Sequence, residues 1–158
     1  MQSIKPKGAI MRILIILICL TALLIPSTAL GGEDFIGGLR NVQGTAMVKR
    51  GEQQIQAEDG FRIYLNDILI TENDGAMGVV FKDDTRISLG PNSKITITRF
   101  VYQPDQKKYN FITKMIQGTA AYVSGAIGKA SPDAVKFKTP VATIGIRGTT
   151  FLAKVEPE

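Results

Sequence analysis

The stretch Thr139-Pro140-Val141-Ala142-Thr143-Ile144-Gly145-Ile146-Arg147-Gly148-Thr149-Thr150-Phe151 predicts an extended strand that starts at a Thr-Pro corner and breaks at Gly148. A residue that precedes proline is held in extended backbone geometry, so Thr139 suits the start of a strand. Because side chains alternate across a strand, Gly145 and Arg147 are expected on one face. A glycine within such a pattern indicates a bulge or a close backbone approach.

A Gly-Thr step of the same kind occurs three times in the chain. Each copy follows a β-branched residue and a long polar residue and leads back into apolar residues, at Gly44-Thr45, Gly118-Thr119 and Gly148-Thr149. Three similar bends would curl three strands in the same sense. The repetition therefore favours a rolled sheet over a flat one, while its unequal spacing argues against a regular solenoid.

Short apolar or alternating segments, separated by turn residues, fill the chain from Leu39 onward. They predict an all-β domain of about 10–13 short antiparallel strands, built as a rolled or coiled sheet or as a two-layer β-sandwich. Residues 125–133 contain glycine, serine and proline and are expected to form a mobile loop. Besides the opening stretch, strands are predicted at residues 42–48, 53–57, 61–65, 68–71, 76–81, 86–89, 95–102, 109–116, 119–123, 135–138 and 151–155.

The first residues have the layout of a secretory signal. Three cations precede an apolar run from Ile13 to Ile25, and small residues follow it. This run is shorter than the roughly 20 residues that span a bilayer. We expect a signal helix over residues 1–29 with cleavage after Ala29, or else after Gly31. An uncleaved membrane anchor is the alternative.

The remaining chain divides into a short linker at residues 30–38 and a single domain at 39–158. The whole chain has a formal net charge of +5, of which the leader contributes three positive charges. The rest is only mildly basic, which does not favour nucleic acid as a partner. Export through the leader would place the domain in the periplasm or outside the cell.

Amino-acid types that support most catalytic chemistry are scarce. The chain has no histidine, and its one cysteine, Cys19, lies in the leader. This excludes Ser-His-Asp and Cys-His catalysis and histidine-ligated metals, so we expect no enzyme activity, no cofactor and no metal. The acidic pairs Asp83/Asp84 and Glu72/Asp74 lie in predicted turns, and a hydrolase that uses only carboxylates is an alternative. Aromatic residues that either fill the core or form an exposed strip for glycans are Tyr102, Tyr109, Phe111 and Tyr122.

The order of these segments resembles FecR-like domains, the periplasmic part of a family of iron-transport regulators. The resemblance rests on Asn66–Thr71, Gly75–Phe81, Ile87–Ser93 and the opening stretch, and it covers roughly Gln43 to Phe151. It implies an all-β periplasmic domain, often a sensor for an outer-membrane receptor. Anti-sigma members also carry a cytoplasmic segment before a membrane helix. Only a short tail precedes the apolar run here, so a stand-alone exported domain is expected.

The resemblance also selects candidate interaction residues: Thr139, Pro140, Gly145, Arg147, Gly148 and Thr149. Arg147 either pairs with a carboxylate or a loop carbonyl, or contacts a partner or an anionic ligand. We expect a protein or peptide of the cell envelope to bind an exposed sheet edge, with Leu152 and Val155 on the candidate edge strand. A module that binds peptidoglycan or another cell-wall glycan, and a membrane-anchored signalling regulator, are the alternatives. The membrane would be contacted only through an uncleaved N-terminus.

The leader prediction has a direct test. Intact-mass measurement of the protein recovered from its own cells should give a chain that begins at Leu30, or at Gly32 if the second cleavage position is used. Detection of the full-length chain in the membrane fraction would contradict cleavage and support the anchored alternative.

Overall fold

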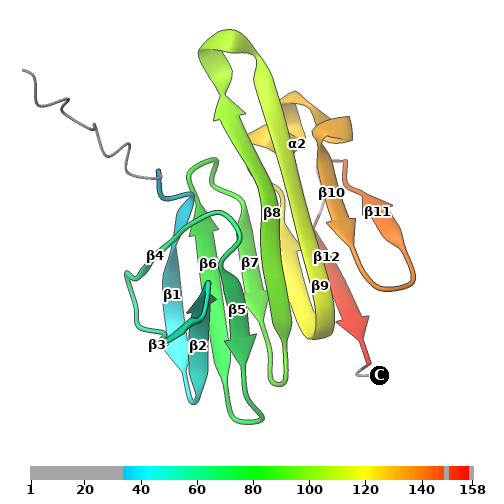
Figure 1. The fold of residues 1–158 in the computed structure, drawn as a ribbon. Helices are drawn as coiled ribbons and strands as arrows, with labels where there is room; N and C mark the ends of the chain where they lie inside the picture. The colour runs from blue at the N-terminus through cyan, green and yellow to red at the C-terminus, as the bar shows by residue number, and fades with distance from the viewer. Residues whose placement is uncertain (1–33, 148–149, 157–158) are drawn as a thin grey trace, which may run out of the picture. The chain divides into compact units, whose positions relative to one another are not determined.

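The computed structural model describes residues 34–147 and 150–156 (Figure 1). The predicted signal segment, the start of the linker, Gly148 and Thr149 lie outside these ranges. Within them, no helix combines the length and apolarity needed to cross a membrane. The described chain forms a 12-stranded sheet. Its elements are β1 Gly37–Gln43, β2 Ala46–Arg50, β3 Gln53–Gln56, β4 Arg62–Ile63, β5 Ile68–Thr71, β6 Ala76–Phe81, β7 Arg86–Leu89, β8 Lys94–Gln103, η1 Pro104–Gln106, β9 Lys108–Val123, α2 Ala126–Ala130, η2 Pro132–Ala134, β10 Val135–Lys138, β11 Thr143–Gly145 and β12 Thr150–Val155.

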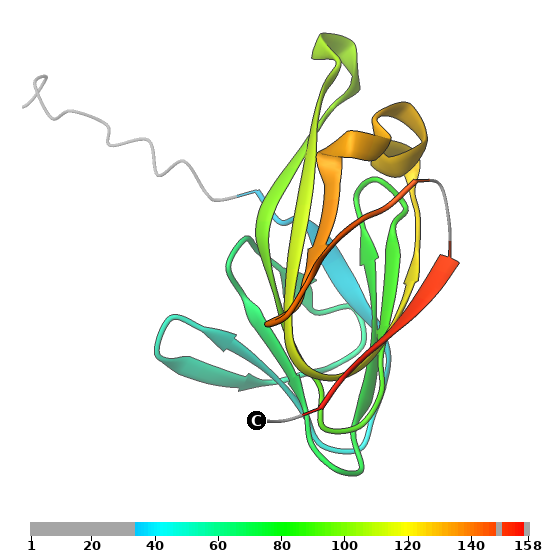
Figure 2. The same ribbon diagram turned by 90° about the vertical axis from the view of Figure 1, so that its right-hand side faces the viewer.

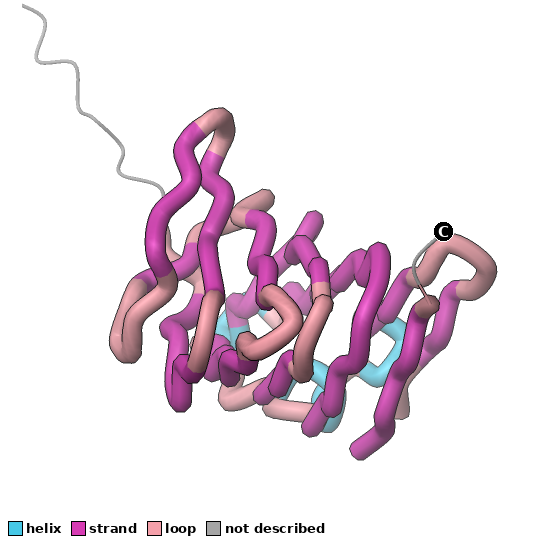
Figure 3. Tube along the Cα trace, turned by 90° about the horizontal axis from the view of Figure 1, so that it is seen from below, coloured by secondary structure: helices cyan, strands magenta, loops and turns pink. Residues whose placement is uncertain are grey.

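The sheet curls so that its two halves face each other (Figures 2 and 3). One half runs β4-β1-β6-β7-β9-β12, and the other runs β3-β2-β5-β8-β9-β10-β11. Strand β9 belongs to both halves, because its first part pairs with β8 and β10 and its last part pairs with β7 and β12. The predicted all-β fold is confirmed, in its rolled form. Its core includes Leu39, Val48, Ile63, Leu69, Ile87, Ile95, Phe111, Met115, Tyr122 and Phe137.

Glycines with positive φ make the turns between the two halves. Gly44 has φ +60° between β1 and β2, and Gly118 has φ +95° within β9. A Cβ on Gly44 would overlap the Asp74 carbonyl oxygen, and one on Gly118 would overlap Ser93. Both positions therefore demand glycine on conformational and steric grounds. These are the first two predicted Gly-Thr bends; the third, at Gly148, lies outside the described residues.

The threonine after each of these glycines is held by a loop that connects the two halves, β5–β6 for Thr45 and β7–β8 for Thr119. The Asp74 carboxylate accepts a hydrogen bond from the Thr45 N–H at 3.2 Å, and the Thr45 carbonyl accepts one from the Glu72 backbone N–H at 2.9 Å. Ser93 Oγ accepts a hydrogen bond from the Thr119 N–H at 2.9 Å. Each bend thus satisfies backbone groups that the interrupted ladder would leave unpaired.

Two predicted strand boundaries are wrong, and the glycines explain both. The single strand predicted at 42–48 is split by Gly44 into β1 and β2. The two strands predicted at 109–116 and 119–123 are one strand, β9, because Gly118 bends the chain without ending its pairing.

The mobile loop predicted at 125–133 is also wrong, because this segment contains α2 and η2. Ile127 of α2 is fully buried, and its N–H donates to the Asp83 carboxylate at 3.2 Å. The Ala126 N–H donates to the Asp83 carbonyl at 2.7 Å. The helix forms a crossover that brings β10 alongside β9 in parallel, an exception to the antiparallel prediction.

Replacing Gly118 with alanine should destabilise the protein strongly. The alanine would have to adopt the positive φ of Gly118, which a Cβ disfavours, and its Cβ would overlap Ser93, so we expect a loss of about 2–4 kcal/mol in the free energy of unfolding by urea. Gly145→Ala is the matched control, because a Cβ there meets nothing within 4 Å. The control should stay within about 0.5 kcal/mol of the parent. Equal losses in the two variants would refute the role of Gly118.

Candidate interaction site at the open edges of the sheet

The last two strands of the described chain, β11 and β12, are edge strands of the curled sheet (Figure 2). Among the described strands, β11 pairs only with β10, and β12 pairs only with β9. Each therefore has one side whose N–H and C=O groups face no neighbouring strand. Such an edge accepts an additional strand from another chain.

A groove of about 510 Å³ separates the two edges. The tip of the β10–β11 hairpin forms one wall and β12 forms the other. Its apolar side chains are unusually open: Val141 is 92% exposed, Leu152 83% and Ile144 38%. Exposed apolar residues that gather in one place mark an interaction surface more often than scattered ones do.

Thr139 and Pro140 form the hairpin tip and do not lie within a long strand. Thr139 N–H donates to the Ala142 carbonyl at 2.8 Å, and the Ala142 N–H donates to Thr139 Oγ1 at 3.0 Å. Proline suits the second position of such a turn because its φ is already set. Residues 139–151 thus contain a turn, the short strand β11 and the start of β12. Gly148 and Thr149 lie outside the described residues.

Arg147 and Gly145 lie beside a second, shallow hollow with Asp133 and Lys136. Ile146 between them is 3% exposed, and its N–H donates to the Val135 carbonyl at 3.4 Å. Arg147 is exposed, and no ion pair or hydrogen bond links its side chain to another described residue. Both interpretations of Arg147, a structural pairing and a contact with a partner, therefore stay predictions.

Strand β12 is anchored by one face and free on the other. The Phe151 ring stacks on Tyr122 at 5.2 Å between centroids and meets Phe137 edge-on at 5.3 Å. Val155 also packs against the core, whereas Leu152 points away from it. Leu152 and Val155 were predicted from the sequence and both line the groove, whereas Val141 and Ile144 were not predicted as groove residues. An apolar residue next to proline in a turn was the available signal for Val141.

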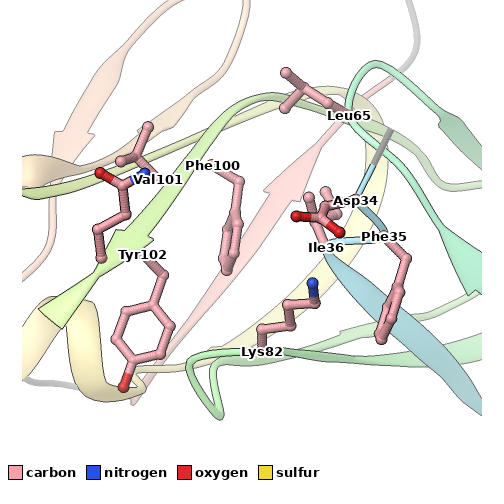
Figure 4. A pocket seen from close by; sticks show the side chains of 9 residues that line it. Asp34, Phe35, Ile36, Leu65, Lys82, Phe100, Val101 and Tyr102 are labelled. Carbon is pink, nitrogen blue, oxygen red and sulfur yellow. The ribbon is translucent and has the colours of Figure 1, made fainter. Parts of the chain in front are cut away.

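The residues considered for other chemistry are dispersed. Phe111 and Tyr122 are buried in the core, so they form no exposed strip with Tyr102 and Tyr109. In the hollow near the N-terminal end of the described chain, Figure 4 shows a single acidic side chain, Asp34, among mostly apolar neighbours. The described residues contain no group of three or more side chains suited to a metal.

Asp83 belongs to a buried structural cluster with Thr85 and Tyr122. Its carboxylate accepts a hydrogen bond from Thr85 Oγ1 at 2.7 Å, and its neighbour Asp84 is exposed. Burial raises the pKa of Tyr122 to about 12; the Asp83 charge adds to this rise and the Thr85 hydroxyl opposes it. A phenol with such a pKa stays protonated at neutral pH. The cluster secures α2 and leaves Asp83 inaccessible to a substrate.

The raised pKa of Tyr122 makes stability depend on alkaline pH. The unfolded chain loses the phenolic proton near pH 10, whereas the folded chain keeps it until about 12. Between these values the unfolded state binds fewer protons, so the free energy of unfolding should fall by up to about 1.4 kcal/mol per pH unit. Urea unfolding from pH 8 to 11 should show this decline in the parent. Tyr122→Phe should remove this contribution; an undiminished decline would assign it to other groups.

Comparison with known proteins identifies a protein family. A family model described as FecR protein matches residues 67–158, a range that contains Gly118, the β10–β11 hairpin and β12. No curated protein and no solved structure matches the chain.

Proposed function

Because the chain belongs to the FecR protein family, we propose that it is an exported signalling domain of the cell envelope that works by binding a protein partner. Proteins of this family are signalling regulators that act with other proteins. The leader predicted from the sequence supports export to the periplasm or beyond. The proposal is that the domain recognises its partner and catalyses no reaction.

The observation that carries this proposal is the apolar groove between two open edges. An extended segment of a partner would pair with the free side of β12 or β11 through main-chain hydrogen bonds. Its apolar side chains would contact Leu152 and Val141, which are largely exposed in the described chain. Burying a leucine side chain contributes about 1.5–3 kcal/mol, enough to make Leu152 a dominant contact.

The way β12 is held supports the same mechanism. Phe151 fixes the strand to the core through two ring contacts, so the edge keeps its extended form before a partner arrives. A preformed edge loses little conformational entropy on binding. A glycan-binding module built on exposed aromatics has less support, since Phe111 and Tyr122 are buried.

A photo-crosslinking residue placed at Leu152 or at Val141 should trap the same envelope protein in living cells. Placement at Thr98, on the outer face of β8, should not trap it. Adding Leu152→Lys to the Val141 probe should reduce the adduct at least about tenfold, because the leucine contact is lost. Leu65→Lys, a change at a similarly apolar but distant residue, is the matched control.

Two results would contradict the edge mechanism. One is an adduct of equal yield from the Thr98 position. The other is an adduct that survives Leu152→Lys in a variant whose thermal unfolding matches the parent's.

A further inference from the structure

Positive and negative side chains are segregated in this fold. No strand, as the structure bounds it, contains an aspartate or a glutamate, and the described acids lie in the connections between strands, in the two short helices η1 and η2, or beyond the first and last strands. Lysine and arginine, in contrast, occur in most of the strands. The outer faces of the curled sheet therefore carry positive charge without interspersed acids. The mild net charge of the chain after the leader conceals this pattern.

A basic face is formed by four exposed side chains on β8, β9 and β10: Arg99, Lys114, Lys136 and Lys138. Buried residues alternate with these cations along β9 and β10, so the lysines project from the outer face. The register places Lys138 directly beside Lys114. It also places Arg99 and Lys136 on either side of Ile112.

This arrangement is unfavourable for the protein alone. Neighbouring strands lie about 5 Å apart, and like charges directly opposite each other destabilise a sheet. No ion pair or hydrogen bond connects these four side chains to any acid in the described ranges. A bound anion would convert the repulsion into attraction, and salt would weaken that attraction.

The surface next to Lys136 is open to a ligand. Gly145 is paired with Lys136 across β10 and β11, and a Cβ on Gly145 would meet nothing within 4 Å. No steric crowding requires a glycine there, unlike at Gly44 and Gly118. Gly145, Lys136 and Arg147 line a hollow of about 420 Å³ with one acid, Asp133, at its border, so a polymer backbone could approach the sheet closely on the Lys136 side.

We propose that the basic face binds a linear anionic polysaccharide through its acidic groups. The row Thr96-Lys114-Lys138-Thr143 crosses four adjacent strands. The half-buried Thr96 hydroxyl donates to the Asp67 carbonyl at 3.0 Å, so the donors that the row presents are the two lysine ammonium groups and the exposed Thr143 hydroxyl. None of these side chains is aromatic, so the stacking that holds single-stranded nucleic acid is missing. An acidic protein would gain most from aromatic anchors, which this row also lacks. The face shares no residue with the apolar groove, so this inference is independent of the proposed function.

Binding to alginate, a polymer of uronic acids, tests the proposal, with neutral dextran and polyglutamate as comparison probes. The protein recovered from its own cells should bind alginate at low ionic strength, bind polyglutamate more weakly and leave dextran unbound. The double variant Lys114→Gln/Lys138→Gln should lose at least about tenfold in affinity for alginate. The control Lys107→Gln/Lys108→Gln removes equal charge at the far end of the β8–β9 hairpin and should lose less than about twofold.

Each other outcome overturns the proposal. Equal losses of alginate affinity in the two double variants would mean that the polymer adsorbs through the net charge of the protein. Absence of alginate binding at low salt would show that anionic polysaccharides are not the ligand. Polyglutamate bound as tightly as alginate would indicate an acidic protein instead. A lower melting temperature for Lys114→Gln/Lys138→Gln would assign the lysines to the fold, because relief of their repulsion should leave stability unchanged or higher.

Discussion

The left-handed bends at Gly44 and Gly118 are the constraint on which the structure depends. Each lets the chain pass between the facing halves of the sheet, and each is held by a loop residue, Asp74 or Ser93. A Cβ on Gly44 would overlap Asp74, and a Cβ on Gly118 would overlap Ser93. Without these bends the apolar faces of the two halves could not close over one core, and burial of that core is the main favourable term in folding.

The same curl produces the open groove. Strand β11 ends one half of the sheet and β12 ends the other, so the final two strands present free edges to each other. Soluble proteins commonly protect such edges with charges, as the pair Lys154 and Glu156 does at the end of β12. Leu152 interrupts that protection with an exposed apolar side chain. An edge strand that exposes a leucine to solvent risks aggregation. A bound partner segment that covers Leu152 therefore explains this exposed leucine better than permanent contact with solvent does.

Local patterns in the sequence were sufficient for most strands and for the first two bends, since alternation and a Gly-Thr step are properties of neighbouring residues. Contacts between distant residues could not be predicted this way. The helix α2 depends on Asp83, which lies far away along the chain and looked like a solvated turn acid. For the same reason the parallel pairing of β10 with β9 was missed. The absence of acids from the strands, however, was open to inspection in the sequence.

The β10–β11 hairpin connects the two proposed surfaces. Ile144 and the tip residue Val141 border the apolar groove, whereas Lys136 and Lys138 belong to the basic face. A protein segment and a charged polymer could therefore bind the same hairpin without competing for a side chain. Binding at one surface would change affinity at the other only if it shifted the hairpin between two arrangements, since coupling requires states that each ligand prefers differently. The hairpin is held through Phe137, which is buried against Phe151 of β12, so a displaced β12 is the structural route by which such coupling would travel.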